Sequence, residues 1–441
     1  MKPLNESMKI TDKDSFDIII AGAGCAGFCA AVQAGRLGLR TAVFDEYGSA
    51  GGTMTVMGSN SIDQFNNPHR PVGDRMIIGG IAWEFVRELE KRGFAAIPDM
   101  DAEYRVHWQY GVKVNPIAAA QCMDDFLIAA NVDIHYHQKI VAVETHEEYG
   151  RVTVDSVLVS DKSGLSRYKA KVFIDCTGDG DLCAWAGADY ECADSLQPGT
   201  LRLYIDHLVQ NPDALKTAEK RWREAIARDA SLKQMATFAD LTSLLSGDGD
   251  NQNHICNINA TDSDSLTKAE ILSRRYLKQL MDILNDSGLN NPFIAASPAI
   301  GIRESRRIIG DTIMTEADYL NKRIYDDAVC YTYWFIDIHR AGQASHIVYL
   351  HDDKTPTISL GALCPTKLNN MFVAGRCVSA DRACSSAIRV KASCMAMGQA
   401  ASAAAMVYLC EGEAKTIHDI CTKSVCRLLA REGAIVPDQR K

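Results

Sequence analysis

The sequence predicts an α/β protein with a central parallel sheet flanked by helices. Residues 16–45 have the pattern of a strand, a glycine turn, a helix, a second strand and an acid. A later apolar strand ends at Ile174 and enters a turn of small residues. A third strand, residues 369–374, is followed by Gly375 and a long helical segment. Strands that alternate with helices typically build a parallel sheet.

The first of these units has the spacing of a dinucleotide-binding turn. An apolar run, residues 16–20, meets Gly22, Gly24 and Gly27 before a helical segment, residues 26–37. Gly22 permits the tight turn, Gly24 lets the backbone approach a pyrophosphate, and Gly27 lets helix and strand pack closely. The diphosphate then lies against free N–H groups at the helix N-terminus. A glycine-rich turn in an ordinary βαβ unit is the alternative.

The residues that follow support a nucleotide site. Asp45 comes 18 positions after Gly27, at the end of a second apolar strand, where a carboxylate binds the hydroxyls of a ribose. The next loop, residues 48–63, is rich in Gly, Ser, Thr and Asn. We expect it to wrap the same ligand with its backbone amides; a plain surface loop is the alternative.

Composition and charge restrict the partners of the chain. Its 441 residues carry a net charge of −9, which offers no basic surface to nucleic acid or anionic lipid. The first 14 residues lack the apolar core of a signal peptide, and the stretch 395–410 is too short and too weakly apolar to span a bilayer. Fifteen cysteines without a CxxC motif indicate free thiols in a reducing compartment. We therefore expect a cytoplasmic protein with no membrane span, no nucleic-acid partner and no metal site.

The remaining elements follow from hydrophobic periodicity and turn residues. Helices are expected over 79–93, 115–130, 213–229 and 263–284, and strands over 132–137, 139–144, 151–160, 168–174, 201–205 and 328–338. Residues 385–406 are expected to pass through a glycine turn at 398–400 into an alanine-rich helix. The predicted organisation is a nucleotide domain made from residues 1–190 and 351–441, with an inserted α+β cap domain, residues 191–350.

Long motifs in this order resemble the FAD-dependent oxidoreductase family of the glutathione-reductase-like flavoproteins, whose relatives include fumarate reductase and succinate dehydrogenase flavoproteins. The matching motifs, between residues 16 and 409, are AGAGCAG, FDEYGSAGGT, IDCTGDGDL, QPGTL, GIRESRRIIGD, YWFIDIH and FVAGRCVSADRACSSAIRVKASCMAMGQAASAAA. The resemblance implies a Rossmann-like FAD-binding domain built from both chain ends and an inserted substrate domain. It leaves open whether FAD is covalently attached.

The resemblance also implies particular FAD contacts. It places the diphosphate at Gly22, Gly24 and Gly27 and the adenosine ribose at Asp45. Further contacts are expected at Gly52, Thr53, Gly178, Asp179, Gly375, Arg376 and Ala400. The N-terminus of the last long helix is expected to point at the flavin pyrimidine ring, where its dipole favours negative charge. Ser402 departs from the family pattern, because relatives have glycine there.

Arg303, His339 and Arg389 are the candidates that the resemblance suggests for substrate anchoring and proton transfer, because fumarate-reductase relatives use arginine and histidine for these tasks. Tyr333 and Asp337 are candidates to orient His339. Structural alternatives remain open: ion pairs of the RESRR segment with Glu304, Asp311 and Glu316, and a core position for His339.

The predicted function is transfer of a hydride or electron pair between flavin N5 and a small polar substrate, which is anionic if the arginines bind it. A flavin-dependent monooxygenase and an FAD-binding scaffold or sensor without turnover are the alternatives. The acidic charge disfavours a tRNA-modifying flavoprotein. No second GxGxxG motif follows a later strand, so a built-in NADPH domain is not expected. The substrate, the electron acceptor and the oligomeric state stay open, and a homo-oligomer is compatible with the sequence.

Overall fold

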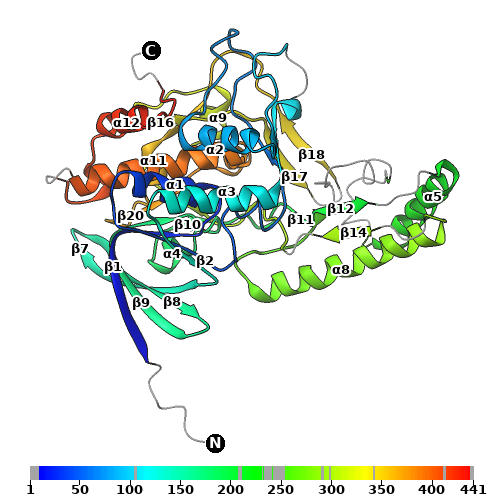
Figure 1. Ribbon diagram of the computed structural model, residues 1–441, viewed down its shortest axis with the longest axis horizontal. Helices are drawn as coiled ribbons and strands as arrows, with labels where there is room; N and C mark the ends of the chain where they lie inside the picture. Colours follow the sequence, from blue (N-terminus) through cyan, green and yellow to red (C-terminus); the bar gives the residue numbers. More distant parts are fainter. Residues whose placement is uncertain are drawn as a thin grey trace, which may run out of the picture.

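The computed structural model describes residues 9–103, 107–206, 211–230, 232, 241, 254–289, 293–296, 299–340, 343–410 and 414–437. Figure 1 shows a main body, from which one helical arm projects.

A seven-stranded sheet forms the centre of the body. Its parallel strands are β6 (Asp133–Tyr136), β2 (Thr41–Asp45), β1 (Ile10–Ala21), β9 (Gly164–Asp175) and β20 (Met371–Val373). On its other edge, the first half of β9 pairs with β8 (Arg151–Asp161), which with β7 (Lys139–Glu148) forms an antiparallel meander. Because β20 pairs with β9, both ends of the chain build this sheet, and the predicted α/β fold is confirmed.

The helices next to this sheet contact one another in one layer, α1 (Cys25–Arg36), α2 (Gly80–Lys91), α3 (Pro116–Ala129) and α11 (Lys391–Cys410). Local signals explain their bounds. Asn115 accepts hydrogen bonds from the N–H groups of Ile117 and Ala118 and so caps α3, with Pro116 at its first position. The N-cap of α1, Gly24, has no side chain, so no capping side chain occupies the backbone N–H groups in the first turn of α1.

The expected glycine turn at residues 398–400 is wrong. These residues lie inside the continuous helix α11, after a shorter helix α10 (Arg382–Ile388). Gly398 serves close packing instead, because a Cβ there would lie 2.0 Å from the carbonyl oxygen of Ala26 on α1. Small residues therefore mark a helix crossing at this place.

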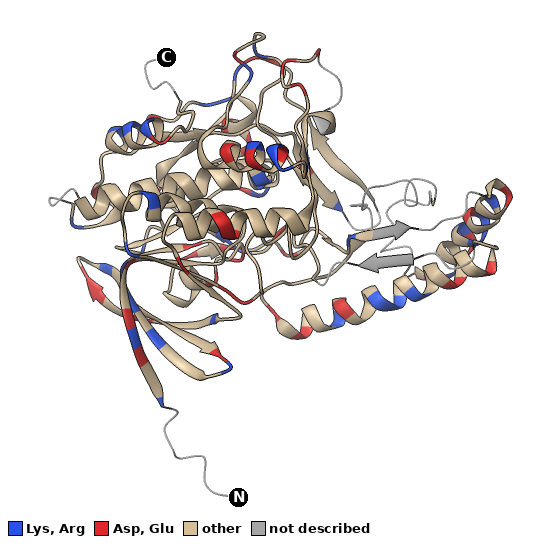
Figure 2. Cartoon of the chain, in the orientation of Figure 1, with Lys and Arg blue, Asp and Glu red and all other residues tan. Residues whose placement is uncertain are grey.

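The projecting arm contains α5 (Pro212–Arg228), α8 (Ser263–Asp286) and the pair β12 (Leu203–Asp206) and β14 (Phe293–Ala296). Acidic and basic residues both occur along α8 (Figure 2), while Tyr276, Leu280 and Leu284 are buried against Trp222 and its neighbours. This second hydrophobic cluster draws on residues 201–300, whereas the buried apolar residues from 308 onward, except Phe335, belong to the main core. The domain boundaries stay predictions.

Shorter elements make up the rest of the secondary structure in the described ranges. They are β3 (Ser61–Ile62), β4 (Ala95–Ala96), β5 (Val112–Val114), α4 (Asp181–Trp185), β10 (Tyr190–Glu191), β11 (Gly199–Thr200), β13 (His254–Ile255), β15 (Arg307–Ile308), α9 (Glu316–Leu320), β16 (Ala328–Tyr331), β17 (Ile336–Arg340), β18 (Gln343–Val348), β19 (Thr357–Ser359), α12 (Thr422–Arg431) and the 3₁₀ turns His107–Tyr110, Leu360–Leu363 and Ile417–Asp419. The single strand expected over 328–338 is therefore two, because β16 pairs with β19 and β17 with β18.

Within the described ranges, α11 is the one helix long and apolar enough to cross a membrane by length and composition. In its most apolar 18-residue window, 72% is buried inside the protein.

Candidate functional site

A cavity of about 1220 Å³ opens where the carboxyl ends of β1, β9 and β20 meet. The turns that follow these strands supply Gly24, Thr177, Gly178, Gly375 and Arg376 to its wall. In open parallel sheets this edge is where ligands bind. The cavity thus lies at the place that the sequence predicted for the nucleotide.

The first glycine turn has the geometry that each glycine was expected to provide. Gly22 has a φ of +86°, which disfavours any other residue. A Cβ on Gly27 would lie 1.8 Å from the carbonyl oxygen of Gly22, so the helix packs directly on the turn. A Cβ on Gly24 would enter open space beside the uncapped start of α1. This open cradle with free backbone donors fits a diphosphate.

The loop after Asp45 folds back beside this turn. Gly51 donates its N–H to the carbonyl of Ala23 at 2.8 Å and forms a β-bridge with Gly24. Gly52 and Thr53 consequently line the cavity. The predicted position of the loop is therefore confirmed, while its contact with FAD stays a prediction.

Asp45 lies at the end of β2, next to the turn. Its carboxylate accepts hydrogen bonds from the backbone N–H groups of Ala23 at 2.7 Å and Tyr47 at 2.9 Å. Burial raises the pKa of Asp45 to about 6, although these two hydrogen bonds oppose the rise. Asp45 is not among the residues that line the cavity, so a ribose contact stays a prediction.

Arg376 joins the second and third turns. Its guanidinium lies 2.9 Å from Asp179 Oδ1 and donates to the hydroxyl of Ser305 at 2.7 Å. Arg376 and Gly178 line the cavity, whereas Asp179 supports Arg376 from the side. Asp179 and Arg376 were both predicted as FAD contacts, and only the tertiary structure shows that Arg376 lines the cavity whereas Asp179 does not.

The structure places Ala400 away from the cavity. It lies in the middle of α11, has no exposed surface and is absent from the cavity wall. An FAD contact at Ala400 is therefore not supported, because packing between helices surrounds this residue. The start of α11 is different, since Lys391 and Cys394 line the cavity, as do Arg389 and Val390 just before the helix.

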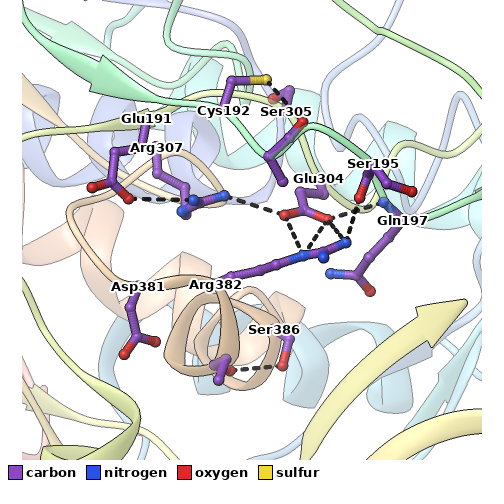
Figure 3. A network of polar contacts seen from close by, with 12 residues as sticks. Glu191, Cys192, Ser195, Gln197, Glu304, Ser305, Arg307, Asp381, Arg382 and Ser386 are labelled. Carbon is purple, nitrogen blue, oxygen red and sulfur yellow. Dashed lines mark hydrogen bonds and ion pairs between the residues drawn. The ribbon is translucent and has the colours of Figure 1, made fainter.

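The three arginines of the RESRR segment have separate environments. Arg306 pairs with Asp181 at 2.7 Å, and Arg307 lies 3.2 Å from the buried Glu304. Glu304 also accepts hydrogen bonds from Arg382 and from the backbone N–H of Gln197 (Figure 3). Structural ion pairs thus account for two of the arginines.

Arg303 is the arginine of this segment that reaches the cavity wall. It is 7% exposed and donates to the carbonyl oxygen of Pro198 at 2.9 Å. Burial and the neighbouring charge of Arg389 lower the pKa of Arg303 to about 9, so its guanidinium stays protonated at neutral pH.

Arg389, Asp337 and His339 meet Arg303 in the same part of the wall. Nε2 of His339 lies 2.9 Å from Oδ2 of Asp337, and Arg389 lies 3.9 Å from the same oxygen. The predicted pairing of Asp337 with His339 is confirmed. The hydroxyl of Tyr333 instead donates to the carbonyl of Leu350 at 3.1 Å. We call Arg303, Arg389, Asp337 and His339 the arginine cluster.

Burial and charge set the protonation states in the arginine cluster. Burial lowers the pKa of His339, the hydrogen bond to Asp337 opposes this, and the charges of Arg303 and Arg389 lower it further. Burial alone would raise the pKa of Asp337, but the hydrogen bond from His339 and the two arginines lower it overall. At neutral pH His339 is therefore neutral and Asp337 is ionised.

Several charged wall residues were missed by the sequence analysis. Lys391 donates to the hydroxyl of Ser59 at 2.7 Å and to the carbonyl of Ser61 at 2.8 Å, and Arg202 also contacts Ser59. The sequence signal that could have identified them was a charged residue within a motif of small residues, as for Lys391 in IRVKAS. The charged residues of the wall are six cations and two carboxylates, Lys113, Arg202, Arg303, Arg376, Arg389, Lys391, Asp63 and Asp337.

This excess of cations contrasts with the net charge of −9 of the whole chain. Together with the open cradle at Gly24, it fits an FAD diphosphate and leaves positive charge over for a second anion. In the ranges that the structure describes, no group of three His, Cys, Asp or Glu residues is arranged to hold a metal ion. All fifteen cysteines are free thiols.

A family model described as "FAD dependent oxidoreductase" matches residues 17–429. A comparison with curated proteins finds no match.

Among solved structures, similarity extends to a geranylgeranyl bacteriochlorophyll reductase-like protein from Thermoplasma acidophilum, with 11% identity over 95% of this chain and 84% of that chain and a TM-score of 0.42. It also extends to the anhydrotetracycline hydroxylase OxyS from Streptomyces rimosus, with 14% identity over 43% of this chain and a TM-score of 0.29. The p-nitrophenol 4-monooxygenase PnpA from Pseudomonas putida is 11% identical over 44% of this chain, with a TM-score of 0.27. The matches cover 37% of the OxyS chain and 48% of the PnpA chain.

Proposed function

Because the chain belongs to the FAD-dependent oxidoreductase family and is therefore an enzyme with FAD as its cofactor, we propose that it oxidises or reduces a small anionic substrate bound at the arginine cluster. The observation that carries this proposal is the position of Arg303 and Arg389 on the same cavity wall as the predicted FAD contacts.

The two arginines bind and orient the substrate. Guanidinium groups recognise carboxylates and phosphates through paired N–H donors. Arg389 has an additional feature, because its buried Nε has no hydrogen-bond partner among the residues that the structure describes. An anion at this position would satisfy that donor and offset the repulsion between the two like charges.

The Asp337–His339 pair handles the proton that accompanies redox chemistry at a carbon centre. A carboxylate that contacts an imidazole keeps the ring in a fixed tautomer and orientation. Both residues line the cavity, so their proton is within reach of a substrate held by the arginines. Bound FAD supplies the two-electron acceptor or donor.

Anaerobic flavin spectroscopy tests the proposal. The FAD-loaded enzyme is titrated with carboxylates, hydroxy acids and sugar acids, and the dithionite-reduced enzyme with their unsaturated analogues. We expect one class to change the flavin spectrum. In Arg389→Gln, the concentration needed should rise at least about tenfold, because a charged hydrogen bond is lost, while FAD remains bound.

Arg306→Gln is the matched control, since Arg306 belongs to the same RESRR segment as Arg303 but pairs with Asp181 outside the cavity. It should respond like the wild type. An equal loss in both variants, or a response to neutral compounds alone, would overturn the anionic substrate. Reduction by NADPH followed by oxygen insertion would point to a monooxygenase, and a flavin that exchanges electrons with no compound would indicate a scaffold or sensor.

A further inference from the structure

His339 makes hydrogen bonds with both of its ring nitrogens. Nε2 lies 2.9 Å from Asp337 Oδ2, and Nδ1 lies 3.1 Å from the hydroxyl oxygen of Ser345. An ionised carboxylate can only accept, so Nε2 carries the proton that it shares with Asp337. Nδ1 of the neutral ring is then an acceptor, and Ser345 donates its O–H to it.

Ser345 lies on β18, opposite the β17 strand that carries Asp337 and His339. It is partly exposed, and its neighbours Ala344 and His346 are exposed. A hydroxyl can donate or accept, depending on how its hydrogen is turned. Ser345 can therefore serve His339 in either charge state, and water at the surface can take up the hydroxyl hydrogen when it turns outward.

The charges next to His339 depend on whether an anion is bound. Arg303 and Arg389 both act against a positive charge on this imidazole. An anion held by these two arginines compensates their charge, so the imidazolium form becomes more favourable. The Asp337 carboxylate, already at Nε2, stabilises that form as soon as the opposing charge is removed.

On this basis, and resting on the anion site of the proposed function, we propose that the enzyme takes up one proton on Nδ1 of His339 when it binds its anionic substrate. Ser345 is the positioning residue whose hydroxyl oxygen accepts the hydrogen bond from the new Nδ1–H. The proton comes from water or buffer and forms the Nδ1–H bond. Nε2 keeps its proton and its contact with Asp337. No other bond changes, and the site gains one positive charge for the negative charge it binds.

Other titratable and charged groups lie around His339, and the variant His254→Asn controls for the one in ring contact with it. The ring of His254 on β13 lies edge-on at 4.8 Å between centroids. Asp337 is on the same strand as His339, and Arg303 and Arg389 come from the loop after residue 300 and the end of α10. His346 lies on β18, and Lys391 is elsewhere on the cavity wall.

Calorimetry with malonate as the anion tests the coupling independently of turnover. FAD-loaded enzyme is titrated with malonate at pH 7 in buffers of different ionisation enthalpy. The slope of the observed binding enthalpy against the ionisation enthalpy of the buffer gives the number of protons taken up per malonate. We expect uptake close to one proton in the wild type, about zero in His339→Gln, and undiminished uptake in His254→Asn. In Ser345→Ala, uptake falls and malonate affinity drops about tenfold, because the imidazolium loses a charged hydrogen bond. Ser345→Thr restores both.

The outcomes separate the two proposals. Failure of malonate and of other small anions to bind would remove the anion site itself. Binding without proton uptake in the wild type would overturn the proton coupling and leave the anion site standing. Uptake that persists in His339→Gln would assign the proton to another group, and a Ser345→Ala enzyme identical to the wild type would remove the role of Ser345.

Discussion

The carboxyl group of Asp45 titrates near neutrality because the surrounding chain removes it from water. Its pKa is raised to about 6 by burial, and the backbone N–H groups of Ala23 and Tyr47 compensate in part for the lost solvent. A single residue at the end of β2 can therefore make cofactor binding depend on pH.

We predict that FAD affinity falls by about tenfold between pH 7 and pH 5. In the predicted contact, the ribose hydroxyls of FAD donate to the ionised Asp45 carboxylate. Binding would then favour the deprotonated form and weaken as the pH falls through the pKa of the free protein. Equilibrium titration of the apoprotein with FAD, followed by flavin fluorescence, measures this. Asp45→Asn should bind FAD more weakly, with no change over the same pH range. A pH dependence that survives in Asp45→Asn would assign it to another group.

Helix α11 connects the core to the site. Its first residues line the cavity, and its middle crosses α1 at Gly398, against the backbone of Ala26. Ala26 itself lines the cavity. The crossing therefore holds the start of α1, and with it the glycine turn, in position.

Two substitutions on α11 should have opposite effects. Gly398→Val forces a side chain into the Ala26 backbone and should lower the free energy of unfolding by about 2 kcal/mol or more. It should also lower the affinity for FAD. Ser402→Ala should be neutral or stabilising by up to about 1 kcal/mol, because the buried Ser402 hydroxyl has no hydrogen-bond partner within the described part of the chain. Urea unfolding followed by circular dichroism measures both. Unchanged stability in Gly398→Val would contradict the close crossing.

At the scale of the whole molecule, Glu304 connects three distant parts of the chain. The carboxylate contacts Gln197 in the segment after β10, Arg307 on β15 and Arg382 on α10 (Figure 3). These parts border the arginine cluster, since Gln197 also accepts a hydrogen bond from the backbone N–H of His339. The network therefore stabilises the position of the chain segments that form this part of the cavity wall.

Glu304→Ala should lower the free energy of unfolding by about 3–5 kcal/mol, because Arg307 stays buried without its closest carboxylate. Glu191→Ala removes the other, half-exposed partner of Arg307 and should cost no more than about 1 kcal/mol. The same urea experiment on the FAD-loaded enzyme compares them. Similar losses in the free energy of unfolding would contradict the prediction that the buried carboxylate of Glu304 contributes more to stability than the half-exposed carboxylate of Glu191.

Spacing along the chain predicted the features that neighbouring residues determine. Gly22 is required by its positive φ and Gly27 by its contact with the carbonyl oxygen of Gly22, and the pattern of apolar residues indicated α1, α2, α3, α8 and the strands of the central sheet. Such signals are local, because a turn or an amphipathic helix needs only residues a few positions apart. The family resemblance extended this to the pairing of both chain ends in one sheet, and the family comparison supports FAD as the cofactor.

Only the tertiary structure decided which charges face the cavity. Arg303 and Arg307 lie four positions apart, yet one reaches the cavity wall and the other pairs with Glu304. The contact of His339 with Ser345 depends on the register of β17 and β18, and Gly398 depends on how α11 crosses α1. These distances are set by chain segments that meet only after folding, so the spacing of residues within each segment does not contain them.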